Sequence, residues 1–175
     1  MLDTFLDNLY GTWFFPDRTF RSMRQTPLLW QAALVVALLS GIDGGRRSGF
    51  DPWLVVGTML GGCLGWLAGA GLLWLLASSF GRSASLSALL MISGFAGLPW
   101  LFLAPAQALG GIAGSLLGLL ALLWFVAWQL WGAAIALDLP WWRLGVLVLL
   151  TFCGGAMALN WLGSGWIAVT SLMGS

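Results

Sequence analysis

Residues 52–80 read PWLVVGTMLGGCLGWLAGAGLLWLLASSF and contain no charged side chain. A helix needs about 20 apolar residues to cross a hydrocarbon core of roughly 30 Å, so this run is long enough to span a membrane. Inside hydrocarbon, every backbone polar group must be paired within the protein, and a helix achieves this within one segment. The stretch therefore predicts a transmembrane helix and an all-α integral membrane fold.

The composition of the whole chain also fits a membrane protein. Of the 175 residues, 60% are hydrophobic and 7% are charged, compared with about 45–50% and about 25% in soluble domains. The charged residues are all Arg or Asp, so most of the usual general acids, general bases and metal ligands are missing. We therefore expect no catalytic site, no metal and no cofactor. A net charge of +1 argues against a nucleic-acid partner.

Apolar runs recur along the chain, and we interpret five of them as spans. They lie at residues 27–42, 52–80, 86–103, 109–137 and 141–161. The third run is expected to be kinked at Pro99 and to stop near Pro105. This pattern predicts an N-terminal interfacial segment (1–26), a five-helix membrane domain (27–161) and a short C-terminal tail (162–175). The N-terminal segment lacks the positive start of a secretory signal, so we expect it to be retained.

The arginines predict the orientation of these spans. Arg18, Arg21, Arg24, Arg82 and Arg143 fall on one side of a five-span arrangement, and Arg46 and Arg47 fall on the other. Because cytoplasmic loops carry the excess of basic residues, the N-terminus is predicted to be cytoplasmic and the C-terminus to lie outside.

The segment before the first span has an amphipathic pattern. Residues 14–27 read FFPDRTFRSMRQTP, in which three arginines spaced three apart form one helical stripe opposite Phe20 and Met23. A cationic segment of this kind suits the headgroup region of a membrane. The candidate docking residues for a soluble partner or an anionic lipid are Phe15, Arg18, Phe20, Arg21, Met23 and Arg24. The alternative is that these arginines are only the basic residues that commonly flank a span on its cytoplasmic side.

Two of the predicted spans carry glycines on one face. These candidate packing residues are Gly57, Gly61, Gly65 and Gly69 in the second span and Gly110, Gly114 and Gly118 in the fourth. Four-residue spacing places each set on one side of a helix, where another backbone can approach closely. We expect the two faces to pack against each other within the chain. A homodimer interface is the alternative.

Polar side chains are scarce within the spans, whereas tryptophan is abundant. Gln31, Gln129 and Asn160 are candidates for intramembrane polar contacts, expected to be interhelical hydrogen bonds, with a substrate or pigment site as the alternative. Trp124, Trp128 and Trp131 share one helix face, which we interpret as a packing surface or, alternatively, a site for lipid, quinone or pigment. No Asp or Arg lies near the middle of a span, which disfavours ion-coupled transport.

The layout resembles the Yip family of Rab/Ypt-interacting multispanning membrane proteins, particularly its short prokaryotic members. The resemblance rests on FFPDRTFRSMRQTP running into the first span, FGRSASLSALLMISGFAGLPWLF (residues 80–102), and LDLPWWRLGVLVLL (residues 137–150). It implies a five-helix membrane bundle without enzymatic activity. Eukaryotic members act in vesicle traffic and bind small GTPases, but they use a long soluble N-terminal domain. The resemblance therefore does not imply GTPase binding for this chain. The short form of the family implies a bacterial protein, located in the inner or an internal membrane.

These observations favour a non-enzymatic integral membrane scaffold that organises or assembles other membrane components. Its expected partners are the lipid bilayer, other membrane proteins and, as a further option, a second copy of the chain. One alternative is an accessory subunit of a larger bioenergetic membrane complex, which would have an apolar flank covered by another chain. The other is a small transporter or lipid-handling protein, which would have a polar cavity near Gln31, Gln129 and Asn160.

Overall fold

The computed structural model describes residues 2–79, 85–140 and 142–151, and this part of the chain is helical and contains no strand. Its helices are α1 (Leu2–Phe14), α2 (Pro16–Gln25), α3 (Leu29–Ser48), α4 (Pro52–Ser79), α5 (Leu86–Phe95), the 3₁₀ helix η1 (Leu98–Phe102), α6 (Leu103–Leu109), α7 (Gly111–Leu137) and a last helix, Trp142–Thr151. Asn160, the predicted tail 162–175 and the second half of the predicted fifth span lie outside the described residues. The all-α prediction is confirmed.

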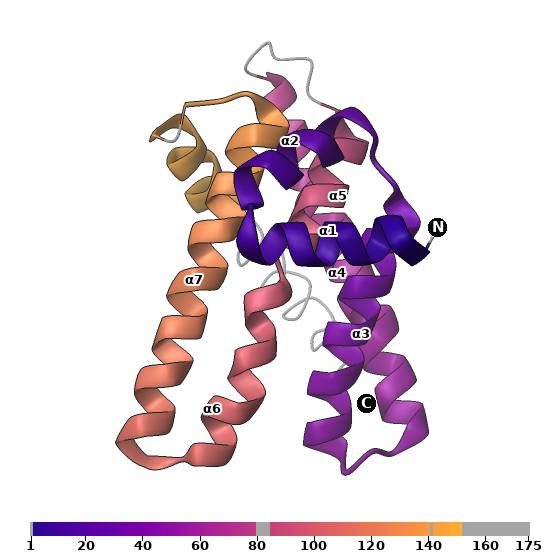
Figure 1. Cartoon of the computed structure of the whole chain (residues 1–175), viewed down its shortest axis with the longest axis vertical. Helices are drawn as coiled ribbons and strands as arrows, with labels where there is room; N and C mark the ends of the chain where they lie inside the picture. The colour runs from indigo at the N-terminus through magenta and orange to yellow at the C-terminus, as the bar shows by residue number, and fades with distance from the viewer. Residues whose placement is uncertain (1, 80–84, 141, 152–175) are drawn as a thin grey trace, which may run out of the picture.

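Two long helix pairs form the body of the molecule (Figure 1). The α3–α4 pair and the α6–α7 pair both run toward the same end of the long axis, and α5 lies between them at the other end. There α5 contacts α2, α3, α4 and α7. Helix α1 runs across the front of the bundle, and α2 lies above it. The N-terminal segment therefore packs on the bundle as an additional layer.

Helix α5 forms the core of this arrangement. Seven of its ten residues are buried, including Leu89, Met91, Ile92 and Phe95 at 1% exposure or less. Ser85 starts the helix, because its side chain accepts a hydrogen bond from the Ala88 N–H and so satisfies one of the unpaired donors of the first turn. Helices α2, α3, α4 and α7 all contact α5, whereas α3 packs most extensively on α4 and α6 on α7.

The predicted kink in the third span is confirmed, but its predicted end is wrong. The 3₁₀ helix η1 contains Pro99 and separates α5 from α6. Helix α6 then continues through Pro105 to Leu109. Pro105 lies in the first turn of α6, where the missing N–H would have no partner in the helix in any case, so the proline is tolerated there.

Three described helical stretches are long and apolar enough to cross a membrane. They are Pro52–Ser79, Leu86–Leu109 and Gly111–Leu137. Helix α3 has 20 residues, but its last turns carry Asp43, Arg46 and Arg47, which shortens its apolar length. The apolar helix Trp142–Thr151 is shorter than a span. The structure thus supports a membrane-spanning helical protein, while the five-span count stays a prediction.

The connection between α6 and α7 depends on glycine. Gly110 and Gly111 have φ values of 62° and 56°, in the left-handed region that residues with a Cβ atom adopt at a cost. Gly110, which the four-residue pattern assigns to a helix-packing face, is therefore a turn residue. Its conformation lets α7 fold back along α6 after a short connection.

Candidate functional site

Aromatic side chains attach α1 to the bundle. The Trp13 ring centroid lies 5.3 Å from that of Trp124, 5.5 Å from that of Trp128 and 5.5 Å from that of Phe102. Part of the predicted aromatic face of α7 is therefore covered by the N-terminal helix of the same chain. Trp131 lies on α7 as well, but it is 43% exposed.

A buried hydrogen bond also links α1 to α3. Asn8 Nδ2 donates to Gln31 Oε1 at 2.8 Å, and Gln31 is fully buried. Gln31 Nε2 has no hydrogen-bond partner among the residues that the structure describes. Asn8 did not emerge from the sequence pattern, because it precedes the predicted spans and no periodic feature connects it with Gln31.

Ser93 of α5 connects two other helices. Gln129 Nε2 of α7 donates to the Ser93 carbonyl oxygen at 3.0 Å, and Trp66 Nε1 of α4 donates to Ser93 Oγ at 3.0 Å. The polar group of Gln129 is thus used for contact between helices. Ser93 was also missed by sequence reasoning, since the acceptor for Gln129 is a backbone carbonyl that no side-chain pattern reveals.

Helix α2 is fixed to the bundle through its apolar side. Phe20 and Met23 are 0% and 2% exposed, and the Phe20 ring centroid lies 6.3 Å from that of Trp128. These two residues were expected in the docking surface, but burial within the chain excludes them from it. Phe15, which was expected there as well, is 60% exposed and remains accessible.

The opposite side of α2 presents Arg18, Arg21 and Arg24, which we call the basic face. Arg21 Nε bonds Asp17 Oδ2 at 2.9 Å, and Arg24 Nη1 lies 3.8 Å from Asp138 Oδ1. The hydrogen bond and negative charge of Asp17 raise the pKa of Arg21 above its ordinary value, so this side chain stays cationic. Arg18 forms no ion pair with any described residue. The face is therefore exposed and only partly neutralised.

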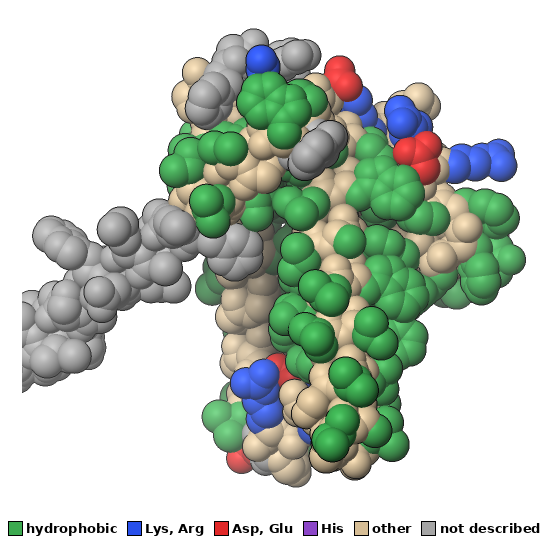
Figure 2. Space-filling model, turned by 90° about the vertical axis from the view of Figure 1, so that its left-hand side faces the viewer, with side chains coloured by type: hydrophobic (Ala, Val, Ile, Leu, Met, Phe, Trp, Pro, Cys, Tyr) green, Lys and Arg blue, Asp and Glu red, His purple; other side chains and the backbone are tan. Residues whose placement is uncertain are grey.

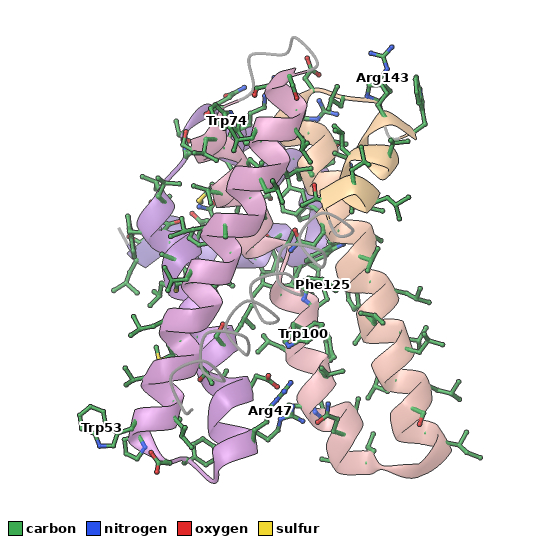
Figure 3. All side chains as sticks on the ribbon, turned by 180° about the vertical axis from the view of Figure 1, so that it is seen from behind. Arg47, Trp53, Trp74, Trp100, Phe125 and Arg143 are labelled. Carbon is green, nitrogen blue, oxygen red and sulfur yellow. The ribbon has the colours of Figure 1, made fainter. Side chains whose placement is uncertain are left out.

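Charged side chains gather at the two ends of the long axis, with mainly apolar side chains between them (Figure 2). Figure 3 places Arg143 at the end that carries α2 and Arg47 at the opposite end. This separation agrees with the predicted topology, in which Arg143 and Arg47 lie on opposite sides of the membrane. Which end faces the cytoplasm stays a prediction.

The glycine faces do not pack as expected within the described chain. A Cβ atom added at Gly57, Gly61, Gly65 or Gly69 would meet no described atom within 4 Å outside its own neighbourhood. One at Gly114 would meet the Ala106 backbone, and one at Gly118 would lie 3.8 Å from the Ala106 Cβ. The α7 glycines thus pack against α6 and not against α4, because the short connection between α6 and α7 places these two helices side by side.

Neither of two pockets in the described structure includes Gln31 or Gln129. One has a volume of about 10 Å³ and is lined by residues of α3, η1 and α6. The other is an open groove of about 250 Å³ between α6 and α7. Within residues 2–79, 85–140 and 142–151, no three His, Cys, Asp or Glu side chains group as metal ligands.

Comparison with known proteins identifies the family. No curated protein and no solved structure matches the chain. A family model described as the Yip1 domain matches residues 10–170. The matched region includes the basic face of α2, all the apolar helices from α3 onward and the segment beyond Thr151. Because the match covers more than half of the chain, the protein belongs to the Yip1 domain family of membrane proteins.

Proposed function

We propose that this protein is a non-enzymatic integral membrane scaffold of the Yip type, which helps to assemble or arrange other membrane components. The basic face of α2 is the proposed docking surface. One observation carries the proposal: α2 is fixed to the bundle by the buried Phe20 and Met23, while its arginines are left exposed. A fixed helix presents its charges in a constant arrangement, which lowers the entropy lost when a partner binds.

The charges on this surface indicate the chemistry of the partner. Asp17 and Asp138 offset part of the charge of Arg21 and Arg24, whereas Arg18 has no ion-pair partner in the described structure. The surface is therefore positive, and it favours an acidic protein segment or an anionic lipid surface. Exposed charges of this kind act over about 10 Å at 0.1 M salt, so docking should weaken as the ionic strength rises.

The proposed setting is a bacterial inner or internal membrane crossed five times, with a cytoplasmic N-terminus and an external C-terminus. Support comes from the excess of arginines at the end that carries α2. The fifth crossing is the predicted run 141–161, whose described part is the apolar helix Trp142–Thr151. In this orientation the basic face of α2 lies at the cytoplasmic headgroup level.

The accessory-subunit alternative has one observation in its favour. Gly57, Gly61, Gly65 and Gly69 leave a smooth apolar flank on α4 that no described residue covers. A second copy or another membrane protein could pack there. The transporter alternative is less favoured, because Gln31 and Gln129 bond to Asn8 and Ser93 of the same chain and line neither described pocket.

Changing Arg18, Arg21 and Arg24 together to Gln is expected to release the docked partner. Each arginine should contribute about 1 kcal/mol at an anionic surface, so the triple variant should lose most of the binding at low salt. High salt should reproduce the loss in the wild type. The measurement is quantitative mass spectrometry of what purifies with the chain from native membranes, over a series of salt concentrations.

The matched control replaces Ser22 and Gln25 by Ala, since both are exposed on the same helix and neither is charged. Orientation is checked with a reporter that is active only outside the cytoplasm, fused before Met1 or after Ser175. Only the fusion after Ser175 should give signal. If the triple variant keeps this orientation and retains every partner at all salt concentrations, the arginines are a topology signal alone and the docking proposal is wrong.

A further inference from the structure

A second charged group lies at the end of the molecule opposite α2. Asp43, Arg46 and Arg47 belong to the last turns of α3. Figure 3 places Arg47 at this end together with Trp53, which is 85% exposed. Tryptophan is enriched where a membrane meets water, so this group is expected at the headgroup level of the second leaflet.

One carboxylate in this group serves two guanidinium groups. Asp43 accepts from Arg46 Nη2 at 2.7 Å and pairs with Arg47 Nη2 at 2.8 Å. No other ion pair reaches these arginines in the part of the chain that the structure describes, so the two guanidinium groups share one carboxylate. Asp51, which follows α3, instead accepts hydrogen bonds from the Trp53 and Leu54 N–H groups at the start of α4. The Arg47 side chain is 67% exposed. An anion in the headgroup layer can therefore reach it directly.

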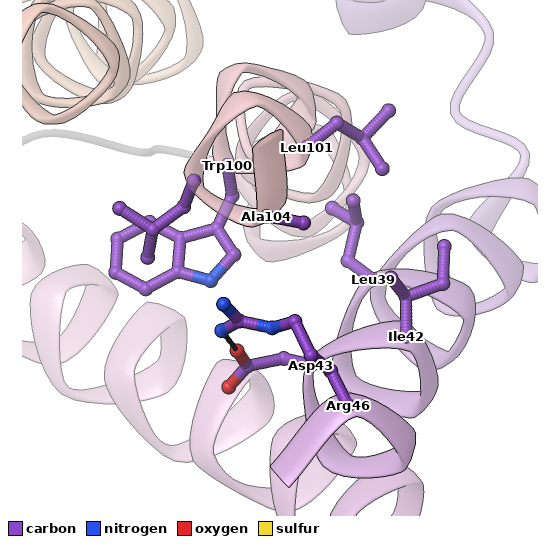
Figure 4. Close-up of a pocket in the computed structure, with 8 residues that line it drawn as sticks. Leu39, Ile42, Asp43, Arg46, Trp100, Leu101 and Ala104 are labelled. Carbon is purple, nitrogen blue, oxygen red and sulfur yellow. Dashed lines mark hydrogen bonds and ion pairs between the residues drawn. The ribbon is translucent and has the colours of Figure 1, made fainter. Parts of the chain in front are cut away.

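Arg46 extends from α3 toward the other helix pair. Figure 4 shows its guanidinium group beside the Asp43 carboxylate and facing the Trp100 ring. Its Nη1 donates to Gln107 Oε1 of α6, and its Nε is buried without an acceptor among the described residues. The small, partly open pocket beside it has about 10 Å³, enough for about one water molecule. Arg46 is thus held in place between α3 and α6 by Asp43 and Gln107.

Gln107 also lines the groove between α6 and α7. The groove has a volume of about 250 Å³, and Gly110, Gly114 and Gly118 contribute bare backbone to its wall, with Ser115 beside them. Because Gln107 accepts the hydrogen bond from Arg46, the groove adjoins the charged group. Pockets for drug-sized ligands have about 300–1,000 Å³, so this smaller, open and mainly apolar groove suits part of one unbranched acyl chain.

We propose that this end of the bundle binds one anionic phospholipid, with its phosphate on Arg47 and an acyl chain in the groove between α6 and α7. Charge complementarity identifies the ligand: a zwitterionic headgroup brings its own cation, whereas an anionic one gives the two guanidinium groups that share Asp43 a second anion. The site is separate from the basic face of α2, and the inference does not depend on the proposed docking function.

The test reconstitutes the purified full chain in phosphatidylcholine vesicles that contain phosphatidylglycerol and measures retained lipid by native mass spectrometry. Wild type should retain phosphatidylglycerol over phosphatidylcholine. Arg47→Gln should weaken this retention about fivefold, the factor that corresponds to about 1 kcal/mol for one basic residue at an anionic surface. Gly118→Leu leaves the charges in place and should weaken lipid retention, because its side chain fills the groove. Its Cβ would make ordinary van der Waals contacts with Ala106 and Leu103, both at 3.8 Å.

Arg143→Gln is the matched control, because Arg143 is an exposed arginine at the other end of the bundle. It should leave the retained phosphatidylglycerol unchanged. An equal loss in Arg143→Gln, or no loss in either test variant, would overturn the proposal. Displacement by inorganic phosphate alone would mean a simple anion site. If Gly118→Leu alters the oligomeric state with lipid retention unchanged, the groove belongs to an interface between copies.

Discussion

Replacing Gly94 by Leu is expected to lower the Tm of the purified protein by roughly 5–10 °C. A Cβ at this position would lie 2.8 Å from the Ala32 Cβ and 3.2 Å from the Ala32 Cα and carbonyl oxygen. These atoms belong largely to the α3 backbone, so rotation of one side chain cannot make room, and α3 and α5 would have to separate. Thermal unfolding in detergent measures the change.

Gly61→Leu is the control for this substitution, because a Cβ at Gly61 would meet no described atom within 4 Å. We expect its Tm to stay close to that of the wild type. This reverses the expectation from the glycine pattern, which assigns tight packing to Gly61 and Gly65. Similar losses at Gly61 and Gly94 would contradict the packing described for α5.

Replacing Trp128 by Ala is expected to loosen both N-terminal helices. Trp128 is 6% exposed, and its ring centroid lies 5.5 Å from that of Trp13 in α1 and 6.3 Å from that of Phe20 in α2. Removing a buried Trp costs about 3–5 kcal/mol. Trypsin cleavage after Arg18 and Arg24 should accelerate by more than about tenfold, since proteolysis requires local opening of α2.

Trp131→Ala is the matched control, because Trp131 lies on the same helix but is 43% exposed. Its cleavage rate at these arginines should resemble that of the wild type. If Trp128→Ala leaves the cleavage rate unchanged, or if both variants accelerate it equally, α2 is not fixed to the bundle through Trp128.

The helices of the membrane domain could be predicted because each needs one long apolar run. The uncharged run that starts at Pro52 became α4, and the proline-containing run became α5, η1 and α6. What the runs do not specify is which helix lies beside which. Helix α5 proved central because its small and apolar residues meet four neighbours, an arrangement that hydropathy alone does not encode.

The glycine faces show how a repeated pattern can mislead. The regular spacing from Gly57 to Gly69 says only that the face is smooth, and a smooth face can contact lipid as well as protein. Several close contacts between helices in the described structure occur instead at glycines outside this spacing, including Gly94 against α3 and Gly132 against Ile92 of α5. An isolated glycine has no periodic signal, so its role becomes visible only with the fold.

Helix α1 was not predicted as a packed helix, for a similar reason. Its inner side carries Phe5 and Trp13, which pack on the core, while Leu6 and Tyr10 on the outer side are 56% and 60% exposed. The exposed Asp3 and Asp7 belong to the same helix, so its exposed surface mixes apolar and acidic residues and the sequence shows no clean division into an apolar and a polar side. In a membrane, Leu6 and Tyr10 can contact lipid in place of water.

The central claim is that the N-terminal helices are fixed to the membrane bundle and hold the basic face of α2 at its surface. Cysteines at Asn8 and Gln31 test it most directly, in a chain with Cys63 and Cys153 changed to Ala, because the native side chains are hydrogen-bonded at 2.8 Å. In native membranes, a short thiol cross-linker should join this pair within one chain. It should fail with cysteines at Leu6 and Gln31, since Leu6 is exposed on the outer side of α1. No cross-link between positions 8 and 31, or equal cross-linking of both pairs, would contradict the account.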